Sequence, residues 1–122
     1  EQQPATPACD QMLRGEPATI AFSGATQFDY ARDVAEATLV ALDTGVDAAA
    51  VYNTAGVVAT VDEFVAEVRA QLPAAEITIE GGALPFPPSL EALGFEREIG
   101  PFPRTPLADG IAETIVLLDA VR

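Results

Sequence analysis

The segment Thr60-Val-Asp-Glu63 constrains the fold of this chain more than any other part of the sequence. A threonine followed by a glutamate at this spacing forms a capping box, in which the two side chains satisfy free backbone N–H groups at the start of a helix. Such a cap contributes about 1 kcal/mol of stability. Apolar residues then recur at helical spacing until Pro73 ends the run. The sequence therefore predicts a helix that begins at this cap and presents one apolar face.

Short alternating segments predict strands on either side of this helix. Residues 18–22, 27–30 and 76–80 each place apolar side chains at every second position, which is typical of half-buried strands. Residues 50–54 form a brief apolar run that Gly56 closes. Such a run is typical of a strand buried on both faces.

Three further helices are expected. A short helical turn is predicted over residues 8–14. The alanine-rich segment that follows is expected to begin with Asp33 as its N-cap, with Glu36 as the reciprocal acid, and to end at Gly45. A last helix is expected to begin with Thr105 as its N-cap.

Two details of these helices concern packing. In the alanine-rich helix, Ala35, Leu39 and Leu42 fall on one stripe, and its small residues imply close packing. In the last helix, Gly110 costs about 1 kcal/mol relative to alanine. We therefore expect it to permit the close approach of a neighbouring backbone.

The fold class expected from these elements is α/β, with a small mixed sheet of about five short strands and four helices. Residues 1–7 are polar and rich in proline, and we expect a flexible lead-in there. Residues 8–122 then form a single domain, since 122 residues are one domain's worth of chain.

The charge balance excludes several classes of function. The sequence has 19 acidic residues and 6 basic ones, all arginine, with a net charge of −13. This charge repels nucleic-acid phosphates and anionic lipids, so neither is expected as a partner. A solvated acidic surface is favoured over an acidic binding face. With no lysine or histidine, a serine or cysteine nucleophile has no ordinary general base.

Other chemistries find little support in the sequence. Cys9 is the only cysteine, which excludes an internal disulfide and a multi-cysteine zinc site. Carboxylate pairs such as Asp29 with Asp33 could serve glycoside hydrolysis, but helix capping and solvation already explain several of these acids. No apolar stretch is long enough to span a bilayer and no signal peptide is present, so a cytoplasmic protein is expected. Because the chain begins with Glu1, its start is not expected to be native.

Segments spread along most of the chain, about residues 12–120, resemble in their order the C-terminal half of an extended short-chain dehydrogenase/reductase of the NAD-dependent epimerase/dehydratase family. They are Gln27-Phe-Asp-Tyr-Ala-Arg-Asp33, Val51-Tyr-Asn53, Thr60-Val-Asp-Glu-Phe64 and Thr105-Pro-Leu-Ala-Asp-Gly-Ile111.

The resemblance implies the substrate-binding half of a Rossmann-type enzyme, whose front half holds NAD or NADP and the catalytic residues. This sequence contains no G-x-G-x-x-G motif. Neither Tyr30 nor Tyr52 is followed by the lysine of the family's Tyr-x-x-x-Lys pair. We therefore assign no catalytic, cofactor-binding or metal-binding residue, and expect a chain that is catalytically incomplete.

The resemblance and the proline-rich segment 83–106 together suggest a substrate pocket. Arg32 stands where the family has a first acid, and Thr26-Gln27 stand where the family often has an arginine that binds a sugar phosphate. The resemblance therefore implies a small polyol, sugar acid or lactone-like substrate more than a nucleotide-linked sugar. By position in the family pattern, Gln27, Tyr30, Asn53 and Phe86 line this pocket, and Arg104 meets a substrate carboxylate. The alternatives are core packing for Tyr30 and Phe86, and a surface salt bridge for Arg104.

A second function remains open from the sequence alone. The alternative is a free-standing interaction or oligomerisation module derived from the same fold. A strand such as residues 51–54, normally buried on both faces, leaves an open edge if its sheet is missing. A homodimer, or pairing with a cofactor-binding half, would cover that edge.

Overall fold

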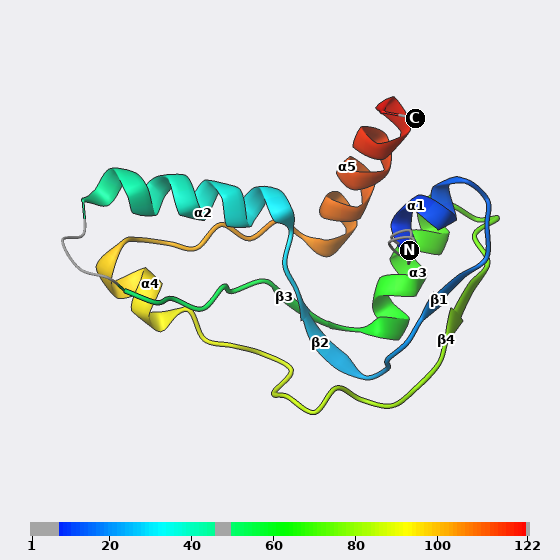
Figure 1. The fold of residues 1–122 in the computed structure, drawn as a ribbon, viewed down its shortest axis with the longest axis horizontal. Helices are drawn as coiled ribbons and strands as arrows, with labels where there is room; N and C mark the ends of the chain where they lie inside the picture. Colours follow the sequence, from blue (N-terminus) through cyan, green and yellow to red (C-terminus); the bar gives the residue numbers. More distant parts are fainter. Residues whose placement is uncertain (1–7, 46–49, 122) are drawn as a thin grey trace, which may run out of the picture.

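The computed structural model describes residues 8–45 and 50–121 (Figure 1). The described chain is mixed α/β, as expected, with five helices and four strands where about five strands and four helices were predicted. In chain order the elements are α1 (Ala8–Leu13), β1 (Ala18–Ile20), β2 (Ala25–Phe28), α2 (Ala31–Thr44), β3 (Val57–Thr60), α3 (Val61–Gln71), β4 (Ile77–Ile79), α4 (Leu93–Glu98) and α5 (Leu107–Ala120).

The strands form two separate pairs. β1 and β4 are parallel, with Ala18 opposite Ile77, and β2 and β3 are antiparallel, with Phe28 opposite Val57. The first pair lies with α1, α3 and α5, while α2 and α4 lie beyond the second pair (Figure 1). The β2–β3 pair therefore connects the two parts of the molecule.

The strand predicted at residues 50–54 is not formed. In the described structure these residues have no strand partner, and the side chain of Val51 is 97% exposed. A strand requires a neighbour to hydrogen-bond its backbone, and this chain supplies none at that position. The prediction of a buried strand over residues 50–54 was therefore wrong.

The capping box is present as predicted. The Thr60 hydroxyl accepts a hydrogen bond from the Glu63 N–H at 3.1 Å, and the Thr60 N–H donates to Glu63 Oε2 at 2.7 Å. α3 begins directly after Thr60.

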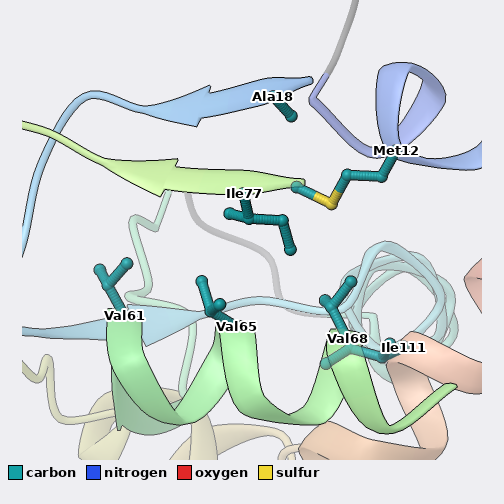
Figure 2. Packing of buried hydrophobic residues seen from close by; sticks show 7 residues of the cluster. All are labelled: Met12, Ala18, Val61, Val65, Val68, Ile77 and Ile111. Carbon is teal, nitrogen blue, oxygen red and sulfur yellow. The ribbon is translucent and has the colours of Figure 1, made fainter. Parts of the chain in front are cut away.

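The main core lies between α3 and the β1–β4 pair. Val61, Val65 and Val68 recur on one face of α3 and are all buried. Figure 2 shows their side chains directed toward Ile77, with Met12 closing one end. The whole buried cluster is Met12, Ala18, Val61, Val65, Val68, Ile77 and Ile111.

A second, smaller core lies under α2 and α4. Phe95 of α4 packs edge to face against Tyr52 at 5.9 Å and against Phe102 at 5.2 Å, measured between ring centroids. Ala37 of α2 and Ala55 complete the contact. α4 was not predicted, because its six residues bury only Phe95 and lack a side-chain cap.

The start of α2 differs from the prediction. The helix begins at Ala31, and its N-cap is Tyr30, which makes no side-chain capping bond. Asp33 lies in the first turn, is only 7% exposed, and bonds to Thr105 instead of to its own helix. The N-cap prediction for Asp33 was wrong because a neighbouring segment supplies better donors. The predicted stop at Gly45, with a φ of 67°, is confirmed.

The packing face of α2 also differs. Leu39 and Leu42 are 67% and 74% exposed, whereas Asp33 and Ala37 are buried. Ala35, Leu39 and Leu42 are therefore exposed, whereas Val34 and Ala41, which lie beside that stripe, are half-buried next to the second core.

α5 begins one residue later than expected, with Pro106 as its N-cap. The Thr105 hydroxyl donates to Asp33 and so does not cap α5. A Cβ placed on Gly110 would lie 3.5 Å from the Tyr30 ring. The close neighbour of Gly110 is therefore an aromatic side chain, and the expected backbone contact is wrong. Among the described helices, none is long and apolar enough to cross a bilayer.

Candidate functional site

A cluster of polar side chains joins the end of β2 to the extended residues 50–56. The amide nitrogen of Gln27 donates to Asp29 Oδ1 at 3.0 Å, to the Thr54 carbonyl at 3.2 Å and to the Thr54 hydroxyl at 3.1 Å. The Thr54 hydroxyl in turn donates to Asp29 Oδ2 at 3.1 Å. The Gln27 carbonyl oxygen accepts from the Leu90 N–H at 3.1 Å. Three distant segments thus meet around one amide.

Local backbone rules explain why these groups meet. Gln27 and Asp29 are two positions apart on extended chain, so their side chains leave β2 on the same face. A Cβ on Gly56 would lie 2.2 Å from the Phe28 carbonyl oxygen and 2.6 Å from Asp29 Oδ1. Only glycine allows the chain to pass this close to the end of β2.

Arg104 lies beside this cluster. Its Nε donates to the Ala55 carbonyl at 2.9 Å, and its Nη2 forms a salt bridge with Glu96 Oε1 at 3.2 Å. The side chain remains 51% exposed. Within residues 8–45 and 50–121, no protein acceptor is recorded for Nη1. The salt bridge considered from the sequence is present, and one edge of the guanidinium is still available.

Asn53 is exposed and directly precedes Thr54. Together with Thr54 and Tyr52 it borders a hollow of about 210 Å³ beneath α2, whose far wall includes Phe95 and Phe102. Gln27 and Arg104 therefore meet at the adjacent residues Thr54 and Ala55, whereas Asn53 lines a hollow that neither of them borders.

The Tyr30 side chain contacts α5 and does not belong to this polar cluster. Its hydroxyl donates to Glu113 Oε2 of α5 at 2.5 Å, and Arg32 contacts the other oxygen of Glu113 at 2.6 Å. The hydrogen bond to Glu113 raises the pKa of Tyr30 above its ordinary value, because it stabilises the protonated hydroxyl. Tyr30 therefore belongs to the contact between α2 and α5.

Phe86 is separate from both groups. Its side chain is 64% exposed in the proline-rich segment. The core-packing alternative considered from the sequence does not describe it.

The sequence reading missed Asp29 and Thr54 as members of the cluster. Asp29 could have been predicted, because it lies two residues after Gln27 and so shares its face. No sequence pattern predicts Thr54 as a member of the cluster, since its position depends on how residues 50–56 cross β2. Tyr52 was also missed: its hydroxyl donates to Glu98, which raises its pKa above the ordinary value.

The groups of this site that face solvent are the Asp29 carboxylate and the Arg104 guanidinium. A carboxylate can accept hydrogen bonds from hydroxyl groups, and a guanidinium is suited to a carboxylate. Among the described residues, no group of three or more His, Cys, Asp or Glu side chains could hold a metal ion.

The sequence matches no protein-family model and no curated protein sequence. Its structure is similar to that of UDP-glucuronic acid 4-epimerase from Bacillus cereus in complex with UDP-glucuronic acid and NAD, with a TM-score of 0.76 and 20% identity. That match covers 99% of this chain and 42% of the epimerase.

Other solved structures give the same result. The holo form of a GalE-like L-threonine dehydrogenase from Cupriavidus necator matches with a TM-score of 0.70, 21% identity, and coverage of 93% of this chain and 40% of the dehydrogenase. TunA, an NAD-dependent NDP-hexosamine 5,6-dehydratase involved in tunicamycin biosynthesis, matches with a TM-score of 0.72 and 19% identity, over 94% of this chain and 39% of TunA.

These similarities establish the fold. The chain spans about 40% of the length of the enzymes that it matches. The resemblance to part of an NAD-dependent epimerase/dehydratase is thereby confirmed at the level of the fold.

Proposed function

We propose that this chain is the substrate-binding portion of an NAD(P)-dependent sugar epimerase, sugar dehydratase or sugar-acid dehydrogenase, and is not catalytically complete as it stands. Residues 8–122 would form one domain of substrate-binding type. The proposal is supported by the fold, which matches about 40% of a UDP-glucuronic acid 4-epimerase bound to NAD and of an NAD-dependent NDP-hexosamine 5,6-dehydratase. It is also supported by the sequence, which has neither a glycine-rich dinucleotide motif nor any lysine.

The observation that carries the proposal is that Gln27 and Arg104, from segments far apart in the sequence, bond to the adjacent residues Thr54 and Ala55. Sugar hydroxyls would bond to the Asp29 carboxylate, which is exposed and is held in place by hydrogen bonds from Gln27 and Thr54. A sugar carboxylate would bond to the free edge of Arg104. A small sugar acid is therefore the substrate class that this arrangement suits best.

Calorimetric titration tests the proposal. We expect a hexuronic acid such as glucuronate to bind the isolated chain weakly, and NAD and NADP to show no binding, because the dinucleotide site belongs to the absent half. The variant Arg104→Ala should lose uronate binding. Arg97→Ala is the matched control, since it removes the same charge from the exposed surface of α4.

Either of two results would contradict the proposal. Turnover of NAD or NADP by this chain would show that it is a complete enzyme. Equal uronate affinity in the two arginine variants would remove Arg104 from the site, provided that circular dichroism shows both variants to be folded.

A second function, an interaction or oligomerisation module, is favoured by the exposed apolar surface. Val51 is 97% exposed on extended backbone that has no strand partner in the described chain, and Leu39 and Leu42 of α2 are also exposed. An unpaired segment of this kind is suited to pairing as an added strand at the edge of another sheet. The partner we favour is a separate cofactor-binding half, because the matched enzymes are more than twice as long as this chain.

Light scattering distinguishes the arrangements. A particle of 12.7 kDa is the free chain, and twice that mass is a homodimer. Val51→Asp should disrupt either assembly if the edge is used, because a charge there would be buried unpaired. An assembly that forms equally well with Val51→Asp would exclude this edge as the interface.

A further inference from the structure

A second cavity lies beside the end of β2 and shares Asp29 with the polar cluster. It occupies about 140 Å³ between β2, α3 and α5. Phe28 and Phe64 form one wall, stacked with ring centroids 4.8 Å apart and planes inclined by 4°. Because side chains alternate along a strand, Phe28 faces this cavity while Gln27 faces the polar cluster.

The walls of this cavity are almost entirely aliphatic or aromatic. Val68 and Leu72 come from α3, and Ile111, Ile115 and Leu118 come from α5. Gly110, whose missing side chain leaves space beside the Tyr30 ring, forms part of the α5 wall.

The polar groups at its edge are already bonded to protein. The Thr114 hydroxyl donates to the Gly110 carbonyl at 2.7 Å, and the Thr105 hydroxyl donates to Asp33 at 2.6 Å. The hydroxyl of Tyr30 is bonded to Glu113. Among the described residues, no buried side-chain nitrogen or oxygen lacks a partner.

These satisfied groups determine what the cavity can hold. The cavity is partly open to solvent, so without a ligand its apolar walls are in contact with water, which is unfavourable. An apolar cavity of about 150 Å³ in another protein is known to admit benzene. The acidic groups Asp29 and Glu113 beside the cavity, and the net charge of −13, disfavour an anion.

We propose that the cavity between β2, α3 and α5 is a binding site for one small, uncharged apolar molecule of about the size of a single aromatic ring. The site is distinct from Gln27 and Arg104, which do not line it, although Asp29 lies at the edge of both sites. The ligand would be held by contact with the side chains of α3 and α5 and would displace water from their apolar surface. The proposal goes beyond the proposed function and does not depend on it.

Benzene is the probe for a test on the whole chain. In methyl-selective NMR spectra, we expect saturable shifts confined to the methyl groups that line the cavity, above all those of Val68, Ile111 and Ile115. The thermal midpoint should rise with benzene concentration, because a ligand that binds only the folded state stabilises it.

Two variants on adjacent residues of α5 make the test specific. Ile115→Trp fills the cavity and should weaken benzene binding by about tenfold or more. Val116→Trp introduces the same side chain at a position that is 67% exposed and outside the cavity, and should bind benzene as the unmodified chain does.

The outcomes separate the two sites. Benzene shifts that do not saturate, or that spread over exposed methyl groups, would overturn the proposal, as would equal binding by the two tryptophan variants. If Ile115→Trp does not fold, the proposal is tested by which methyl groups of the unmodified chain shift when benzene is added. Arg104→Ala should leave benzene binding unchanged, so failure of the sugar-acid site would not be mistaken for failure of this one.

Discussion

Replacement of Asp33 by alanine should destabilise this chain more than replacement of any other carboxylate whose contacts are described above. The Asp33 carboxylate is 7% exposed and accepts two short bonds from Thr105, one from the N–H at 2.6 Å and one from the hydroxyl at 2.6 Å. These bonds fix the first turn of α2 to Thr105, two residues before the start of α5. They therefore hold together segments that are 72 positions apart in the sequence.

The magnitude follows from the number and type of the bonds. A hydrogen bond to a charged group contributes about 1.5–3 kcal/mol net. Two of them would give about 3–6 kcal/mol, but Thr105 is only half-buried, and its freed donors can partly reach water. We expect Asp33→Ala to lower the free energy of unfolding by about 3 kcal/mol, a large part of the roughly 5–15 kcal/mol of an ordinary domain.

Urea unfolding followed by far-ultraviolet circular dichroism measures this change. The matched control is Asp43→Ala, which removes an exposed carboxylate from the last turn of the same helix and should change the stability by less than about 0.5 kcal/mol. Thr105→Val removes the hydroxyl and keeps the N–H. In a double-mutant cycle with Asp33→Ala it should show a coupling of about 1–2 kcal/mol.

Two results would refute the reasoning. A loss below about 1 kcal/mol in Asp33→Ala would mean that water replaces the Thr105 donors at little cost. Strict additivity in the double-mutant cycle would mean that the two side chains do not interact in solution.

Three further predictions concern local features. Gly110→Ala should raise the stability by about 0.5–1 kcal/mol in urea unfolding, because alanine favours the helix and its Cβ would meet the Tyr30 ring at an ordinary 3.5 Å; a loss would show that the ring cannot accept the methyl group. Thr60→Ala should cost about 1 kcal/mol by the same measurement, since it removes half of the capping box with Glu63, and no loss would mean that water caps α3 equally well. Tyr30 and Tyr52 should both titrate above the ordinary value of 10.0 in ultraviolet absorbance. Because the folded pKa values of these two tyrosines are raised, the stability that they contribute is complete below pH 10.0 and is lost as the pH rises through the folded values. Tyr30→Phe should remove the share of this pH-dependent loss that is due to Tyr30. Unshifted titration curves would contradict the hydrogen bonds to Glu113 and Glu98.

The features that could be predicted from the sequence depend on residues close together in the chain. The capping box at Thr60 and the stop at Gly45 need only their own neighbours, because each satisfies helix ends within a few residues. The alternation of Ile77 and Ile79 predicts β4 for the same reason.

The candidate site could be predicted only in part. The family pattern pointed to Gln27 and Arg104, but their partners, Thr54 and Ala55, lie 27 and 49 positions away. The sequence contains no signal for these pairings, since they depend on how residues 50–56 pass over the end of β2. Asp29 could have been included from strand alternation alone.

The sequence by itself determined where most helices and strands form, because capping, turn and alternation patterns act over a few residues. The tertiary structure decided what those elements contact. It made Asp33 a bridge to Thr105 instead of an N-cap, left Leu39 exposed, and kept residues 50–54 from forming a strand. Each of these outcomes depends on which distant segment is near enough to bond or to bury a side chain, and local propensity carries no information about that distance.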